Sequence, residues 1–216
     1  MSMKNILIIL AFTAMVAASC LAQEKVSFVP RTGIGFVPQY TISGGLRFDI
    51  DRSISKTSNQ WLIISPQVFA LSGQKHDHDF ESLLGAGLDL KHKIYLNPNS
   101  MKPLGFYAQY GLMFQYFSMT EKRLYTQLVP SNGVEYYEVA NGSVKTNLYK
   151  MGGNFHLGYQ WLVGDKVYFD IYTGAGIRIS HNNRNEGFDT WYNNNWVDYG
   201  YSGTLLDAGF RLGFYF

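Results

Sequence analysis

The chain of 216 residues is poor in charge, cysteine and proline. Asp, Glu, Lys and Arg make up 16% of it, against roughly 25% in an ordinary soluble domain. It has no apolar run of about 20 residues, which excludes a helical membrane protein, and its composition excludes a disordered tail and a coiled coil. The formal net charge is +2 without a basic block, so we expect no nucleic-acid partner.

The N-terminus has the pattern of an export signal. Lys4 supplies a basic start, an apolar run over 6–16 follows, and small residues lead to Ala22 and the polar Gln23. A basic region, an apolar region and a small-residue cleavage site define a secretory signal peptide. We therefore predict a signal peptide over 1–22 that is cleaved between Ala22 and Gln23.

The single cysteine, Cys20, falls within this signal. Cleavage after it leaves one domain over 23–216 without a thiol, which excludes a disulfide framework, a thiolate metal site and a cysteine nucleophile. We also expect no cofactor. An alternative stays open: residues 17–20 resemble a lipobox, in which Cys20 would be acylated, although Ala17 stands where a large aliphatic residue is usual.

Aromatic residues make up 16% of the chain, and glycine is abundant at 22 residues. The clearest pattern covers 166–180, where alternate positions from Val167 to Ile179 are mostly apolar and the positions between them include Asp170 and Arg178. A period of two sustained over this length predicts a strand far longer than the usual five or six residues.

Similar alternation predicts eight strands, over 26–37, 40–50, 60–71, 83–96, 104–118, 146–162, 166–180 and 201–216. Short links join some of them, long polar loops are expected at 119–145 and 181–200, and a shorter polar loop is expected at 72–82. The first run has the weakest pattern. The run 60–71 is apolar on both faces and contains Pro66, so its facing stays open.

The two faces differ in a way that suggests lipid outside. The polar face is rich in glycine and has too few charges to coat an exterior, whereas the other face is apolar on nearly every strand. Lipid requires a closed sheet, because unpaired backbone groups cost several kcal/mol each there. We predict an all-β, transmembrane, antiparallel up-and-down β-barrel of eight strands. A soluble lipocalin-like barrel, with the faces reversed, is the alternative fold.

Aromatic residues are expected to form two girdles at the membrane interfaces. The girdle toward the short links comprises Tyr95, Phe106, Tyr159, Trp161, Phe169, Phe214 and Phe216. The girdle toward the long loops comprises Tyr116, Phe117, Tyr149, Tyr199 and Tyr201.

The last strand carries the most specific signal. Phe210, Leu212, Phe214 and the terminal Phe216 occupy alternate positions. In this the chain resembles the Gram-negative outer-membrane β-barrel proteins, in particular the small eight-stranded OmpA/OmpX-like group of the porin family. The resemblance implies location in the outer membrane, contact with its lipid, and recognition of these four residues by the barrel-assembly machinery.

Charged residues of mixed sign are predicted to face the lumen. They are Arg31, Arg47, Asp49, Asp89, Lys91, Lys93, Lys150, Asp170, Arg178, Asp207 and Arg211. An eight-stranded barrel is narrow enough for side chains to fill, so we expect a salt-bridged plug. A small low-conductance channel is the alternative.

Two groups of residues suggest chemistry only weakly. His76-Asp77-His78-Asp79 has the composition of a metal site but no evident third or fourth ligand, so we expect a solvated loop. Ser180 and His181, with Glu186 nearby, resemble part of the triad of lipid A deacylases, which are also eight-stranded barrels. Asn183 stands where that family has serine, so we expect no enzymatic activity and keep a lipid A-modifying enzyme as an alternative.

The long loops are the remaining place for function. Their aromatic residues, set among Asn, Ser and Gly, are Tyr125, Tyr136, Tyr137, Trp191, Tyr192 and Trp196. Aromatic anchors among adaptable polar groups suit recognition. We expect a monomer with a structural or surface-interaction role, whose candidate partner is an extracellular protein or glycan; loops that merely shield the surface are the alternative.

Overall fold

The structure is a computed structural model that describes residues 29–72, 80–97, 101–131, 134–183 and 198–216. Eight strands and one short 3-10 helix occur in this part of the chain. In order they are β1 (Thr32–Phe36), η1 (Pro38–Thr41), β2 (Gly45–Ser53), β3 (Gln60–Ser72), β4 (Phe80–Tyr95), β5 (Gly105–Ser131), β6 (Val134–Val163), β7 (Val167–Asn182) and β8 (Gly203–Tyr215).

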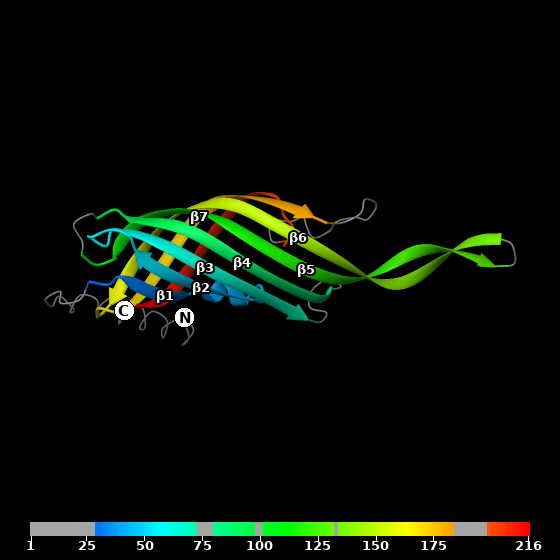
Figure 1. Ribbon diagram of the computed structural model, residues 1–216, viewed down its shortest axis with the longest axis horizontal. Helices are drawn as coiled ribbons and strands as arrows, with labels where there is room; N and C mark the ends of the chain where they lie inside the picture. The colour runs from blue at the N-terminus through cyan, green and yellow to red at the C-terminus, as the bar shows by residue number, and fades with distance from the viewer. Residues whose placement is uncertain (1–28, 73–79, 98–100, 132–133, 184–197) are drawn as a thin grey trace, which may run out of the picture.

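The strands form one closed barrel in the order β1 to β8 (Figure 1). Each strand pairs antiparallel with its neighbours in the sequence, and β1 closes the ring against β8, with Ile34 opposite Phe214. The fold prediction of an all-β, up-and-down barrel of eight antiparallel strands is confirmed. The predicted signal peptide and its cleavage site lie outside the described residues.

The start of the barrel differs from the prediction. The strand expected over 26–37 is reduced to β1, five residues long, and the strand expected from residue 40 begins only at Gly45. Between them η1 starts at Pro38, which suits the first position of a helical turn because its missing N–H needs no partner there. Thr41 then donates a hydrogen bond from its hydroxyl to the carbonyl of Pro38 over 2.7 Å.

The predicted loop 119–145 is wrong. β5 and β6 continue as a paired ribbon from Glu121 opposite Val144 to Ser131 opposite Val134, and this hairpin projects far beyond the barrel (Figure 1). The described pairing with β4 ends at Glu121 and that with β7 at Leu148, and the sequence of the ribbon lacks the apolar row that reveals strands of the barrel wall.

The side chains point into the lumen and to the exterior in the alternation that the sequence predicts. In β7, Ile171, Ile177 and Ile179 are 41%, 62% and 62% exposed, whereas Asp170 is 0% exposed. The open facing of β3 is settled by its burial pattern, in which Trp61, Ile63 and Phe69 point into the lumen and Pro66 points outward. The barrel therefore has an apolar exterior and a polar interior, the reverse of a soluble lipocalin-like barrel.

Glycines allow large side chains to lie flat inside the narrow lumen. The ring of Tyr168 lies over Gly213 of β8 and its hydroxyl over Gly35 of β1, and a Cβ atom at either glycine would clash with it. The Tyr168 hydroxyl donates a hydrogen bond to Asp51 over 2.8 Å. The close approach of the ring thus positions a buried polar contact.

We predict that Gly213→Val destabilises the barrel by about 1–3 kcal/mol, because an added side chain displaces Tyr168 from a packed lumen. Ala208→Val, on the outward face of the same strand, is the matched control and should change stability little. Urea unfolding in detergent micelles measures both variants. Equal midpoints for the two would contradict the described packing.

Candidate functional site in the barrel lumen

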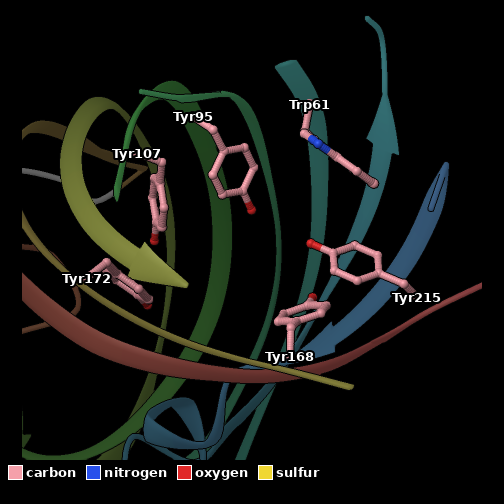
Figure 2. Packing of buried hydrophobic residues seen from close by; sticks show 6 residues of the cluster. All are labelled: Trp61, Tyr95, Tyr107, Tyr168, Tyr172 and Tyr215. Carbon is pink, nitrogen blue, oxygen red and sulfur yellow. The ribbon is translucent and has the colours of Figure 1, made fainter. Parts of the chain in front are cut away.

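The lumen is filled in three layers. The first, near the short turns, is the aromatic layer, made of Trp61, Tyr95, Tyr107, Tyr168, Tyr172 and Tyr215 (Figure 2). The rings of Tyr168 and Tyr215 lie 4.6 Å apart and those of Trp61 and Tyr215 lie 5.1 Å apart. The Trp61 indole N–H donates to the carbonyl of Ser58 over 2.7 Å, so its polar group is paired.

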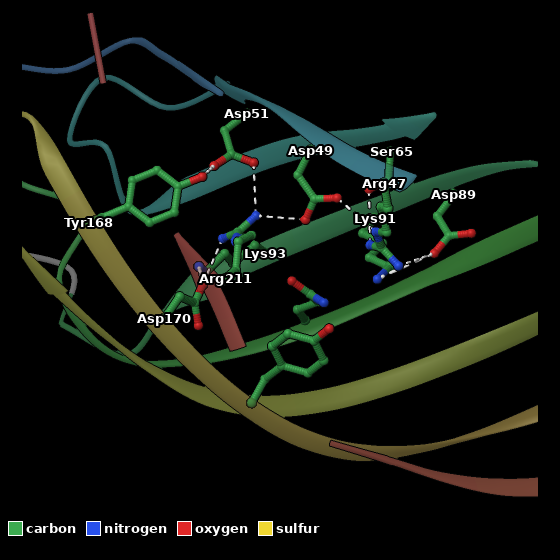
Figure 3. A network of polar contacts seen from close by, with 12 residues as sticks. Arg47, Asp49, Asp51, Ser65, Asp89, Lys91, Lys93, Tyr168, Asp170 and Arg211 are labelled. Atoms are coloured by element: carbon green, nitrogen blue, oxygen red, sulfur yellow. Dashed lines mark hydrogen bonds and ion pairs between the residues drawn. The ribbon is translucent and has the colours of Figure 1, made fainter. Parts of the chain in front are cut away.

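The second layer is a network of buried ions centred on Arg211 (Figure 3). Its guanidinium contacts Asp49 at 3.1 Å, Asp51 at 3.0 Å and Asp170 at 2.7 Å. Lys93 reaches the same Asp170 oxygen at 2.7 Å. One arginine therefore joins carboxylates from two strands, β2 and β7, across the barrel.

Arg47 extends the network along the barrel. It contacts Asp49 at 2.9 Å and Asp89 at 3.0 Å, and Lys91 lies 3.4 Å from Asp89. Gln67 donates a further hydrogen bond to Asp89 over 2.7 Å. These pairs involve four cations and four carboxylates, so the formal charge of the network is zero.

The neutrality of the network matters, because a buried charge without a partner costs several kcal/mol. Each carboxylate of the network also accepts hydrogen bonds from neutral or charged donors; Tyr107, for example, donates to Asp170 over 2.6 Å. Such a network stiffens the barrel by tying opposite walls together.

The third layer lies toward the β5–β6 hairpin. Its buried apolar residues are Phe69, Leu83, Phe117, Met119 and Leu148. Tyr199 packs edge-on against Phe117 with ring centroids 5.1 Å apart and donates a hydrogen bond from its hydroxyl to the carbonyl of Ser43 over 2.8 Å. Burial raises the pKa of Tyr199, which keeps this phenol in its donating, neutral form.

Most of the predicted lumenal charges lie where expected, and two differences stand out. Arg31 is exposed and donates to the carbonyl of Ser55 over 2.6 Å; because β1 begins at Thr32, strand alternation does not direct Arg31 inward. Asp51 was missed, although continuing the alternation of Arg47 and Asp49 by two residues would have found it.

The remaining lumenal charges are outside the network. Asp207 pairs with His156 at 3.1 Å, a partner that the prediction did not include. Lys150 and Arg178 lie nearer the third layer and form no hydrogen bond or ion pair with the described part of the chain.

The residues considered for chemistry are not assembled into a site. Ser180 and His181 are neighbours on β7, so their side chains point to opposite faces, and the Ser180 hydroxyl donates to the carbonyl of Tyr201 over 3.1 Å. Glu186 and 76–79 lie outside the described residues, as do Trp191, Tyr192 and Trp196. In the described part of the chain, no group of three His, Cys, Asp or Glu residues is placed to hold a metal ion.

The fold and lumen define a closed eight-stranded barrel with an apolar exterior and a plugged, ion-paired interior. No protein-family model matches the chain, and no curated protein matches it. Among solved structures it is similar to the crystal structure of Acinetobacter baumannii CarO, with 12% identity over 89% of this chain and 100% of that chain and a TM-score of 0.42. A likeness of this degree carries no argument about function.

We predict that Arg211→Met lowers the free energy of unfolding by about 3–5 kcal/mol, because it leaves Asp51 buried without a cation. The matched control is Arg52→Met, since Arg52 is exposed and its contact is a hydrogen bond to the Thr32 hydroxyl over 2.6 Å. The control should stay within about 0.5 kcal/mol of the native protein. Similar urea midpoints for both variants would refute a central role for Arg211.

Proposed function

We propose that the protein is an exported, integral outer-membrane β-barrel that has no enzymatic activity and acts in envelope structure or surface interaction. The observation that carries the proposal is the apolar exterior of a closed sheet. Outward rows on β4, β7 and β8 expose side chains such as Leu84, Ile177 and Leu206, which are 64%, 62% and 79% exposed. Exposed apolar surface on this scale marks contact with a membrane or a partner.

Several features favour lipid as the surrounding medium. No Asp, Glu, Lys or Arg lies on the outward rows 84–94, 167–179 and 206–216 of these described strands. β3, β4, β7 and β8 have 13 to 16 residues, which exceeds the 9–11 or so that a tilted strand needs to cross the hydrocarbon layer. The strand order closes on itself, with β1 paired to β8, as a sheet surrounded by lipid requires. Among the described residues, no helix is long and apolar enough to cross a membrane.

Outward aromatic rings add a second support. Near the short turns, Phe106, Tyr159, Trp161 and Phe169 form a row in which successive ring centroids lie 4.6 to 5.7 Å apart. Such rings suit the headgroup level of a membrane. The predicted girdles were wrong in three members, because Tyr95 and Phe117 are buried in the lumen and Tyr199 packs there against Phe117.

The exception on the outward face, His92, has a local partner. Its Nδ1 lies 2.8 Å from the hydroxyl of Tyr110 on the neighbouring strand, and the two rings meet edge-on. This contact lowers the cost of placing an imidazole next to lipid, although the other ring nitrogen, Nε2, has no hydrogen-bond partner in the described part of the chain.

The plugged lumen favours a structural role over conduction. The aromatic layer, the ion network and the apolar third layer succeed one another along the barrel, so a hydrated path would have to displace paired charges.

We propose that the barrel-assembly machinery recognises the last strand through four of its residues, Phe210, Leu212, Phe214 and Phe216.

The hairpin of β5 and β6 is the proposed surface for interaction with an extracellular protein or glycan. β4 pairs with β5 only as far as Glu121, and β7 pairs with β6 only as far as Leu148. Beyond these points the outer edges of the ribbon have no described neighbour, and free strand edges can pair with an added strand.

Membrane integration is tested by comparing Ile177→Arg with Ile54→Arg. Ile177 lies on the outward face of β7, away from the aromatic row at Phe169, and arginine near the bilayer midplane costs about 2–4 kcal/mol, whereas Ile54 lies in a short turn outside the strands. We expect the native protein and Ile54→Arg to occur in outer-membrane fractions that resist salt extraction, with heat-modifiable gel mobility, and the folded fraction of Ile177→Arg to be reduced. Release of the native protein by salt alone would refute the proposal.

Conduction and catalysis are tested separately. We expect planar bilayers that contain the purified barrel to show no discrete conductance steps, because the lumen is filled. We expect His181→Ala to leave the lipid A composition of cells unchanged. Regular single-channel steps would favour a small channel, and an altered lipid A would favour the enzyme alternative.

A further inference from the structure

A cavity of about 210 Å³ lies within the lumen, between the ion network and the segment 198–202. Its walls come from η1, β3, β5, β6, β7 and β8, and Tyr199 lies at its side toward the hairpin. The volume is below the roughly 300–1,000 Å³ of pockets that hold drug-sized ligands, so the cavity suits a single-ring molecule.

Two cations line this cavity without an ion-pair partner in the described part of the chain. Lys150 is 5% exposed and Arg178 is partly buried, and neither forms a hydrogen bond or ion pair with the described residues. The two are diagonal neighbours on β6 and β7, because Arg178 lies opposite Gly152, two residues along from Lys150. Gly152 has no side chain to separate them, so two like charges share the same space, and one of them is buried. An uncompensated buried charge is costly, and an anion between the two would relieve that cost.

The acids at the cavity do not remove this imbalance. Asp207 is already paired with His156 at 3.1 Å. Asp198 lines the cavity beside Tyr199, and its charge acts on Lys150. It therefore weakens the field of the two cations without neutralising either.

Aromatic rings form the apolar part of the wall. The rings of Tyr40 and Phe69 lie 6.1 Å apart, those of Phe69 and Phe117 lie 5.0 Å apart, and Tyr199 packs on Phe117. The Lys150 ammonium lies 5.9 Å from the centre of the Phe117 ring. A pair of cations next to a row of aromatic rings suits a ligand that carries a carboxylate on a ring.

We propose that this cavity binds a small aromatic carboxylate, with the carboxylate held by Lys150 and Arg178 and the ring packed against Phe69 and Phe117. The inference rests on the lumen and stands apart from the proposed function, since it requires only that the barrel is folded.

The test is titration of the full, folded barrel in detergent micelles with benzoate, followed by calorimetry at fixed low ionic strength. Benzamide keeps the ring and lacks the charge, and acetate keeps the charge and lacks the ring. We expect saturable binding of one benzoate per barrel. The affinities for benzamide and for acetate should each be at least about tenfold lower, because benzamide loses a charge-assisted contact and acetate loses the binding free energy of a buried ring.

Substitutions identify the site. Lys150→Met keeps the length of the side chain and removes its charge, and we expect it to weaken benzoate binding at least about tenfold. Lys166→Met, near the short turn between β6 and β7, is the matched control and should bind as the native protein does. Asp198→Asn should bind benzoate more tightly, because it removes a repelling charge. Heat-modifiable gel mobility confirms that each variant is folded.

Three results would overturn the proposal: no saturable binding of benzoate, equal binding of benzoate by folded Lys150→Met, or equal affinity for benzamide. Equal affinity for acetate or chloride would overturn the assignment of an aromatic ligand and leave a simple anion site. Each of these results leaves membrane integration untouched, because that is measured by fractionation.

Discussion

Closure of the sheet is the constraint on which the rest of the structure depends. The short β1 pairs with β2 on one side and, over Leu212–Tyr215, with β8 on the other, and this pairing closes the ring of strands. In a closed ring the paired strands satisfy one another's backbone groups, so the exterior can present side chains. An apolar exterior is then compatible with lipid, and alternation forces the polar half of each strand into the lumen.

The lumen has to accommodate those polar residues in little space. Glycines such as Gly35 and Gly213 admit rings that lie flat, and the charged residues of the second layer neutralise one another around Arg211 and Arg47. Because the other lumenal charges are balanced, the charges that remain unpaired are informative. Lys150 and Arg178 are lumenal cations outside this balance, and they lie at the cavity toward the hairpin.

Sequence reasoning could predict what depends on neighbours along the chain. A period of two revealed the strands and the facing of β7, because one lipid-side row and one lumen-side row differ sharply in polarity. It could not settle the facing of β3, where Trp61 and Ile63 are apolar residues inside the lumen. It also missed the hairpin, because the sequence there lacks the alternation that marks the wall strands.

Sequence reasoning could not predict the contacts across the barrel. Arg211 and Asp49 are 162 residues apart, and Lys93 and Asp170 are 77 residues apart. Their meeting depends on the register of every strand between them, which no local pattern encodes. The sequence therefore predicted a plug of mixed charges, and only the structure identifies which charges pair and which two are left over.

The central claim is that lipid, and not water, contacts the outer face. The most direct test is a nitroxide spin label at Leu112, which is 56% exposed on β5, in the barrel reconstituted in lipid bilayers. The account predicts that dissolved oxygen relaxes this label more strongly than a water-soluble nickel complex does. Stronger relaxation by the nickel complex would contradict it.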